Sequence, residues 1–227
     1  MTRFQALALT PALALFSASA IAAPVALTAG DINGLDTTTT SFTDGSLTLT
    51  PFVGGVANTF NADAVRLGID GQGTNNNAFN DIDIDPSNGN EETLQFDFAA
   101  GVGLLSITWD FSRADGPGAD DGVFISGFLA DPNASITGAG NSVTYDAGTG
   151  TIQLDIVAGN FGGADHEVTF ANLSASDGQT LNLRVTDTTQ AGAQLAVVGI
   201  SYDVVPEPSS LALLGLGGLL IARRRRG

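Results

Sequence analysis

The middle of the chain alternates apolar and polar residues with a period of two. In TLQFDFA at 93–99, leucine and phenylalanine alternate with glutamine and aspartate. In LLSITWDF at 104–111, the apolar series Leu105, Ile107 and Trp109 alternates with polar residues. Because successive side chains of a β-strand point to opposite faces of a sheet, each run predicts a strand with one buried face. Trp109 is therefore expected in the hydrophobic core rather than on the surface.

The same alternation recurs in five more runs, which favours an all-β fold. These runs are SLTLT at 46–50, TIQLDIV at 151–157, EVTFANL at 167–173, TLNLRVTD at 180–187 and AVVGISYDVV at 196–205. Polar turn clusters such as DGPGADDG, DPNAS, DAGTG and SASDGQ separate the runs, and no stretch of the middle has a clear helical stripe. Such turns favour antiparallel connections over helical crossovers. The sequence predicts a single antiparallel two-sheet sandwich, jelly-roll-like, with roughly ten short strands.

The charge of the chain is concentrated in its middle. Between residues 24 and 205 lie 23 of the 24 acidic residues, against Arg66, Arg113 and Arg184, which gives this segment a net charge of −20 and no lysine. A surface of this charge repels phosphate backbones and anionic membranes, so nucleic-acid binding is excluded as a function. The chain has no cysteine, which excludes disulfides, thiolate metal sites and thiol catalysis.

The first residues have the features of a signal peptide. Arg3 supplies a small positive region, residues 4–16 are mostly apolar, and small residues follow in SASAIAAP. Ala20 and Ala22 satisfy the small-x-small rule, which places the expected cleavage after Ala22. A buried N-terminal helix is disfavoured because a proline lies inside the apolar run. We expect export across the inner membrane by the Sec machinery.

The chain ends in a short apolar run with a basic tail. Residues 211–222 contain only leucine, alanine, glycine and isoleucine. A helix over this run, even with the two preceding serines, spans about 20 Å, less than the ~30 Å hydrocarbon core. The tail consists of Arg223, Arg224, Arg225 and Arg226. Because arginines favour the cytoplasmic side and halt translocation, the run is expected to form a hydrophobic helix that holds the precursor in the membrane transiently.

A proline pair precedes the apolar run. Pro206, Glu207, Pro208 and Ser209, followed by the apolar run and the terminal arginines, resemble the PEP-CTERM sorting signal of exported proteins in Gram-negative bacteria. The resemblance covers only the C-terminal segment. It implies recognition by an exosortase, cleavage near Pro-Glu-Pro, and delivery to the cell surface or an exopolysaccharide matrix. An ordinary single-span anchor is the alternative.

These features divide the sequence into three parts. We expect a signal peptide at 1–22, a β-sandwich ectodomain at 23–204 and the sorting signal at 205–227. The precursor is then anchored in the inner membrane, and the mature protein lies at the cell surface or in the extracellular matrix.

The segment DIDIDPSNGNEE at 81–92 is the strongest candidate for a metal site. Asp81, Asp83, Asp85 and Glu92 occupy positions 1, 3, 5 and 12 of this window, the spacing of oxygen ligands in an EF-hand loop. Position 6 is a proline, which cannot adopt the turn that the loop needs, so an EF-hand is rejected. A looser calcium site stays open, because an extended strand aligns the three aspartates on one side.

The simpler interpretation of this segment is structural, and we prefer it. An acidic, solvated edge strand would bury Ile82 and Ile84, and its aspartates would block edge-to-edge aggregation. Asp115, Asp120 and Asp121 form a second acidic group, which is better explained as a polar turn. Calcium is the only cofactor that the sequence suggests.

The sequence offers little support for catalysis. His166 is the only histidine, and a surface position is expected for it. No nucleophile elbow or phosphate-binding loop is present. Tyr145 and Tyr202 follow the apolar phase of their strands, which leaves few aromatic platforms for sugars. We expect a non-enzymatic protein of the cell surface or matrix; a calcium-assisted module that binds extracellular polysaccharide is the alternative, and a secreted hydrolase is a weaker one.

Overall fold

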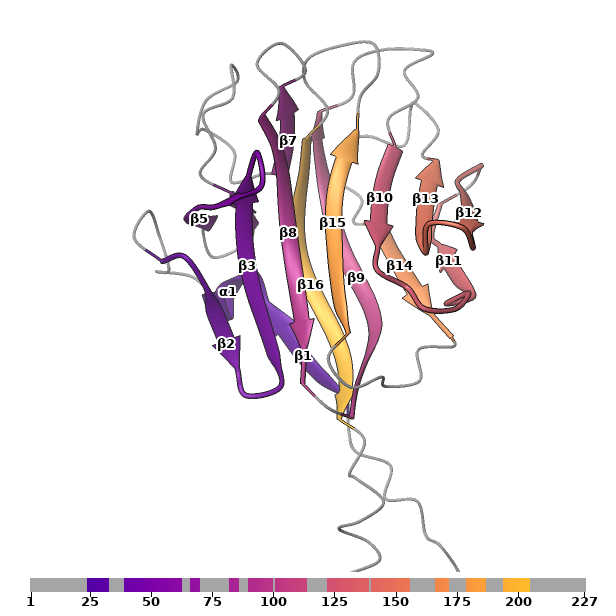
Figure 1. Cartoon of the computed structure of the whole chain (residues 1–227), viewed down its shortest axis with the longest axis horizontal. Coiled ribbons are helices and arrows are strands. Elements are labelled where there is room, and N and C mark those ends of the chain that lie inside the picture. The colour runs from indigo at the N-terminus through magenta and orange to yellow at the C-terminus, as the bar shows by residue number, and fades with distance from the viewer. Residues whose placement is uncertain are drawn as a thin grey trace, which may run out of the picture.

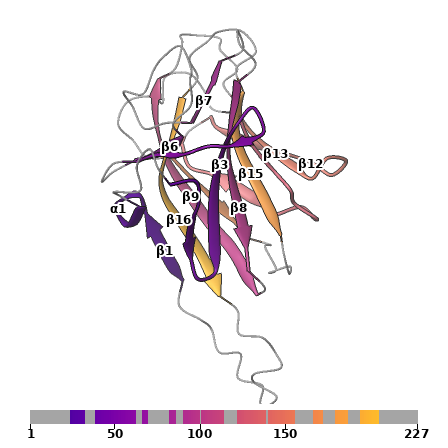
Figure 2. The same ribbon diagram turned by 60° about the vertical axis from the view of Figure 1, so that its left-hand side comes forward.

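Two antiparallel sheets pack face to face in the computed structural model of the chain (Figures 1 and 2). The structure describes residues 24–32, 39–62, 66–69, 82–85, 90–99, 101–113, 122–138, 140–155, 166–171, 179–186 and 194–204. The all-β, two-sheet sandwich predicted from the alternation is confirmed.

The first sheet, sheet A, is centred on two long strands. Its main path runs β11 (Ala134–Ile136), β14 (His166–Phe170), β9 (Val102–Arg113) and β16 (Gln194–Val204). The second edge of β16 is shared by β7 (Ile82–Asp85), β6 (Leu67–Ile69) and β1 (Val25–Thr28), and β5 (Phe60–Ala62) pairs with β6.

The second sheet, sheet B, forms the front layer in Figure 1. Its strands run in the order β12 (Ser142–Asp146), β13 (Thr151–Asp155), β10 (Gly122–Ser126), β15 (Thr180–Thr186), β8 (Asn90–Phe98) and β3 (Leu47–Val53). The far edge of β3 pairs with β2 (Phe42–Asp44) and β4 (Val56–Ala57). All of these pairings are antiparallel.

From β8 onward, the chain crosses from one sheet to the other at most of its connections. From β8 to β16 it changes sheets each time, except at the hairpin between β12 and β13. This alternation between layers agrees with the jelly-roll-like arrangement that we expected. The turns therefore join opposite layers more often than neighbouring strands.

The hydrophobic core lies between the sheets and follows the predicted phase, with one correction. Leu94, Phe96, Ile107 and Trp109 are fully buried. Leu105, however, was expected on the buried face and is only half-buried, whereas Leu104 is buried. The register between β9 and β16 shifts at this point, because Ser201 pairs with Ser106 and Tyr202 pairs with Leu104. The extra residue is a β-bulge, which reverses the inward and outward phases of the strand.

A single helical turn, α1 (Ala29–Ile32), follows β1. The backbone N–H of Thr28 donates to the Asp31 carboxylate at 2.7 Å, which is one half of a capping box, and the Thr28 hydroxyl donates to the same carboxylate at 2.7 Å. These hydrogen bonds lower the pKa of Asp31, and the bond from the Thr28 backbone has the larger effect. Within the described segments, no helix has the length and apolar character needed to cross a bilayer. The predicted signal peptide (1–22) and C-terminal helix (211–222) lie outside the described residues.

The two ends of the sandwich-forming chain lie together. Val25 at the start of β1 pairs with Tyr202 near the end of β16, at the lower end of Figure 1. The Tyr202 hydroxyl donates to the Asp44 carboxylate at 2.7 Å, and this bond links sheet A to sheet B at the same end. β16 is thus hydrogen-bonded to sheet B through Tyr202, two residues before the strand ends.

Replacing Tyr202 with phenylalanine is expected to flatten the loss of stability at alkaline pH. Burial raises the pKa of the Tyr202 phenol above its usual value, and the hydrogen bond to Asp44 raises it further. Above about pH 10 the unfolded chain loses this proton while the folded chain keeps it, so the free energy of unfolding falls as pH rises. Urea unfolding at a series of alkaline pH values measures this slope.

The Asp44→Asn variant is the control for Tyr202→Phe. It removes the charged acceptor but keeps the burial, which is the larger cause, so it should retain most of the alkaline slope. At neutral pH, Tyr202→Phe should cost about 1 kcal/mol for the lost hydrogen bond. Equal slopes in the wild type and Tyr202→Phe would contradict this account.

Candidate functional site

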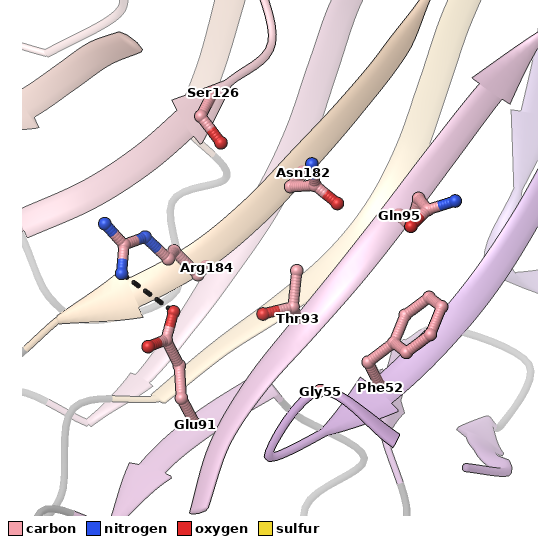
Figure 3. Close-up of a pocket in the computed structure, with 8 residues that line it drawn as sticks. All are labelled: Phe52, Gly55, Glu91, Thr93, Gln95, Ser126, Asn182 and Arg184. Carbon is pink, nitrogen blue, oxygen red and sulfur yellow. Dashed lines mark hydrogen bonds and ion pairs between the residues drawn. The ribbon is translucent and has the colours of Figure 1, made fainter. Parts of the chain in front are cut away.

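An open groove crosses the outer face of sheet B (Figure 3). Its volume is about 400 Å³. The groove is lined by residues from β3, β8, β10 and β15 and from the hairpin after β3, namely Phe52, Gly55, Glu91, Thr93, Gln95, Ser126, Asn182 and Arg184. We call this surface the sheet B groove.

Strand register arranges the lining residues in two parallel rows. In the first row, Ser126 pairs with Asn182, and Asn182 pairs with Gln95. We call these three residues the amide row. In the second row, Arg184 pairs with Thr93, and Thr93 pairs with Phe52. Their inward neighbours are core residues, which fixes the outward direction of both rows.

One ion pair sets the electrostatics of the groove. The Arg184 guanidinium lies 2.9 Å from the Glu91 carboxylate, and each side chain is rather more than a third exposed. The same guanidinium lies over the ring of Phe124, 5.4 Å from its centroid, a cation–π arrangement. Because the two charges balance, the lining carries no net charge. Amides, hydroxyls and one aromatic ring remain for a ligand.

The second feature of interest is the strand that leads out of the fold. β16 is paired along one edge with β9, from Gln194 to Val204, and along the other with β7, β6 and β1. It is therefore an interior strand of sheet A, with Leu195, Val197 and Ile200 buried. Close to its last residue, β16 is therefore paired with strands on both sides.

Comparison with family models decides the nature of that C-terminal segment. Residues 204–226 match the model of the PEP-CTERM protein-sorting motif. The chain carries a PEP-CTERM sorting motif. The motif indicates an exported protein that is sorted by an exosortase and is anchored in a membrane before processing. Neither the curated proteins nor the solved structures gave a match to the chain.

The PEP-CTERM motif contains every residue that the sequence predicted for sorting. Pro206, Glu207, Pro208 and Ser209 and the four terminal arginines lie within the matched range, outside the described residues. The motif starts at Val204, the last residue of β16. The last strand that the structure describes therefore ends where the matched range begins. The signal-peptide residues Ala20 and Ala22 also lie outside the described residues, and their cleavage stays a prediction.

The predicted calcium site remains a prediction. Asp81 and the side chains of Asp83 and Asp85 lie outside the described residues. Glu92 is 4% exposed and shares the inward phase of Leu94 on β8. Among the residues that the structure describes, no group of three or more acidic, histidine or cysteine side chains is placed to hold a metal ion. The second acidic group, Asp115, Asp120 and Asp121, lies outside the description as well.

The strand β7 differs from the expected acidic edge. Ile82 is fully buried, as the structural interpretation requires. β7, however, pairs with β16 through Ile82 and Asp83, and with β8 through Ile84 and Asp85. It therefore joins the two sheets at a corner of the sandwich rather than forming a simple edge.

The expected surface position of His166 is wrong. The side chain is 4% exposed and lies in the inward phase of β14 with Val168 and Phe170. β14 is an inner strand of sheet A, between β11 and β9. In this pairing His166 lies opposite the buried Trp109 of β9. The sequence places the histidine between two acidic residues at the start of a strand, but it does not show that this strand is paired on both sides or that the histidine lies on its inner face. Trp109 and Tyr202 are buried, and Tyr145 packs partly against the core, as their phases predicted.

Sequence reasoning did not single out the sheet B groove. Gln95 was noted only as the polar partner in an alternating strand, and Asn182 and Ser126 were not distinguished at all. A usable signal was present: in a segment of net charge −20, most outward positions of these strands hold amides or hydroxyls, and only Glu91 and Asp97 on β8 are carboxylates. The register that gathers them could not be derived from the sequence.

Proposed function

We propose that this chain is a non-enzymatic component of the cell surface or extracellular matrix. It is exported through the Sec machinery and cut by an exosortase near Pro206, Glu207 and Pro208. The observation that carries the proposal is the PEP-CTERM motif that begins at the last residue of β16. The C-terminal helix would hold the precursor in the inner membrane until this cut.

The arrangement of the chain ends supports this route. β1 begins at Val25, three residues after the expected signal-peptide cut, and it pairs with the end of β16. Both expected cuts would therefore fall outside the described strands, next in sequence to two strand ends that pair with each other. The strand ends at Arg113, Gly122 and Gln194 lie at the opposite end of the sandwich, which would then face away from the membrane in the anchored precursor.

A structural or adhesive role fits the described side chains better than catalysis. His166 is buried against Trp109, away from solvent and from the sheet B groove. The acidic surface keeps the protein soluble and repels other anions. These features support a scaffold rather than a hydrolase.

A carbohydrate-binding role is the second candidate function. It is favoured by one observation, the polar sheet B groove with its amide row and Phe52. The calcium assistance expected from Asp81, Asp83, Asp85 and Glu92 remains part of this second candidate.

Mass spectrometry of the protein recovered from its own cells tests the proposed function. Cytosol, membranes, cell surface and exopolysaccharide are separated first. The mature protein should occur in the last two fractions, with a new N-terminus at Ala23 and a C-terminus near Pro206. A soluble, uncut chain in the cytosol would overturn the proposal, and hydrolysis of a polysaccharide by the purified protein would overturn its non-enzymatic part.

A further inference from the structure

We propose that the sheet B groove binds an extended, uncharged polysaccharide, with the amide row on its hydroxyl groups and Phe52 against a sugar ring. The choice of a polysaccharide rests on the proposed function, because an exopolysaccharide matrix is where the protein is expected. The residues and the charge class of the ligand follow from the groove itself.

The amide row is the first reason for this assignment. Ser126, Asn182 and Gln95 come from three adjacent strands, so their outward side chains stand about 4.8 Å apart in a line (Figure 3). Within the described part of the chain, Ser126 and Asn182 make no side-chain hydrogen bond, and the only one made by Gln95 uses its Nε2, toward Asp97 at 2.8 Å. Donors and acceptors thus remain open along the row. Closely spaced hydroxyls of a sugar chain are the matching partners.

Charge is the second reason, and it selects an uncharged ligand. An anionic polysaccharide would meet a segment of net charge −20. The arginine side chains that the structure describes are each engaged by a carboxylate, because Arg184 pairs with Glu91 and Arg66 pairs with Asp110 at 2.6 Å. A cationic polysaccharide would be attracted to acidic residues throughout the segment and would not be directed to this groove. Only an uncharged chain would prefer the electrically balanced floor of the groove.

The shape of the groove is the third reason. Gly54 and Gly55 both have positive φ, so β3 and β4 are joined by a tight two-residue turn that only glycine adopts easily. This hairpin borders the groove beside Phe52, and Val56 after it is 71% exposed. The floor spans four strands, about 14 Å, and stays open to solvent. A long chain can therefore lie across it without threading its ends.

An ordinary solvated sheet face is the competing explanation, since outward residues of a sandwich are usually polar. A variant pair separates the two. Gln95→Ala combined with Asn182→Ala removes two members of the amide row, while Thr144→Ala changes an exposed threonine on the same face, at the edge strand β12 and outside the groove. Thr93→Ala makes the same chemical change inside the groove.

Binding is measured with the full chain purified in detergent, by affinity electrophoresis and calorimetry. The probes are mannan, hydroxyethylcellulose and the uncharged exopolysaccharide fraction of the host, with alginate as the anionic comparison. The wild type should bind at least one uncharged probe and not alginate. The double variant should lose about tenfold in affinity, Thr93→Ala a few fold, and Thr144→Ala nothing.

Three results would overturn the inference: no binding to any uncharged probe, stronger binding to alginate, or equal affinity of the double variant and the wild type. Thermal melts check that each variant is folded. Should the double variant unfold, Thr93→Gln fills the groove from the solvent side and must weaken binding instead. Because binding is measured on purified protein, it is independent of sorting, and a failure of the proposed cellular route leaves this result interpretable.

Discussion

Replacing Pro206, Glu207 and Pro208 with alanine is expected to abolish maturation of the C-terminus. Proline disfavours the helical conformation of the residue before it, so from the sequence we expect a stiff, extended and accessible peptide before the apolar run. Alanine in all three positions would remove this restriction and would allow a helix over the apolar run to extend backward through the expected cleavage region. The variant should keep its apolar run and arginines and accumulate as an anchored precursor. Immunoblots of membrane and extracellular fractions measure the ratio of the two forms.

Two controls separate loss of recognition from loss of folding. Ser210→Ala changes a neighbouring residue of the same segment without removing a proline, and it should mature like the wild type. Wild-type chain in cells that lack the exosortase should accumulate the same precursor as the triple variant. Normal maturation of the triple variant would show that the Pro-Glu-Pro sequence is not what the processing enzyme reads.

The position of β16 leads us to expect that a cut after its last residue leaves the described sheets intact. Val204 is both the last residue of the strand and the first of the PEP-CTERM motif. β9 and β1 pair with β16 on opposite sides, and Tyr202 is hydrogen-bonded to Asp44 in the other sheet. Cleavage beyond Val204 would remove none of the strand pairings that the structure describes, whereas cleavage within β16 would divide sheet A. The end of the last described strand thus coincides with the start of the sorting motif.

The strands and most of the core could be predicted from the sequence. Each buried face is encoded by local alternation, so Phe96, Ile107 and Trp109 could be assigned to the core without any knowledge of neighbours. The sorting signal could also be recognised, because its chemistry lies in one short contiguous segment.

The arrangement of the strands could not be predicted in the same way. Strands that are neighbours in sequence, such as β9 and β10, lie in different sheets, and alternation carries no information on pairing partners. The bulge near Leu104 and the burial of His166 arise from pairing with β16 and β9, respectively. The sheet B groove depends on the same long-range register, because its lining residues extend from position 52 to position 184.

The core beneath the groove supplies the second large expected effect. Leu183 lies on β15 between Asn182 and Arg184, points inward and is fully buried. Leu183→Ala should lower the free energy of unfolding by about 2–5 kcal/mol, the range for buried leucines, because the removed side chain leaves a cavity between the sheets. The melting temperature should fall by roughly 4 to 20 °C.

Leu129→Ala is the matched control, because it makes the same chemical change at a residue that is 82% exposed. It should change the free energy of unfolding by less than about 0.5 kcal/mol. Below its lowered melting temperature, Leu183→Ala should still bind the uncharged probes, whereas the Gln95→Ala and Asn182→Ala double variant should lose binding at an almost unchanged melting temperature. Similar melting temperatures for Leu183→Ala and Leu129→Ala would mean that β15 does not pack against sheet A as described, and the rows of the groove would then lose their structural basis.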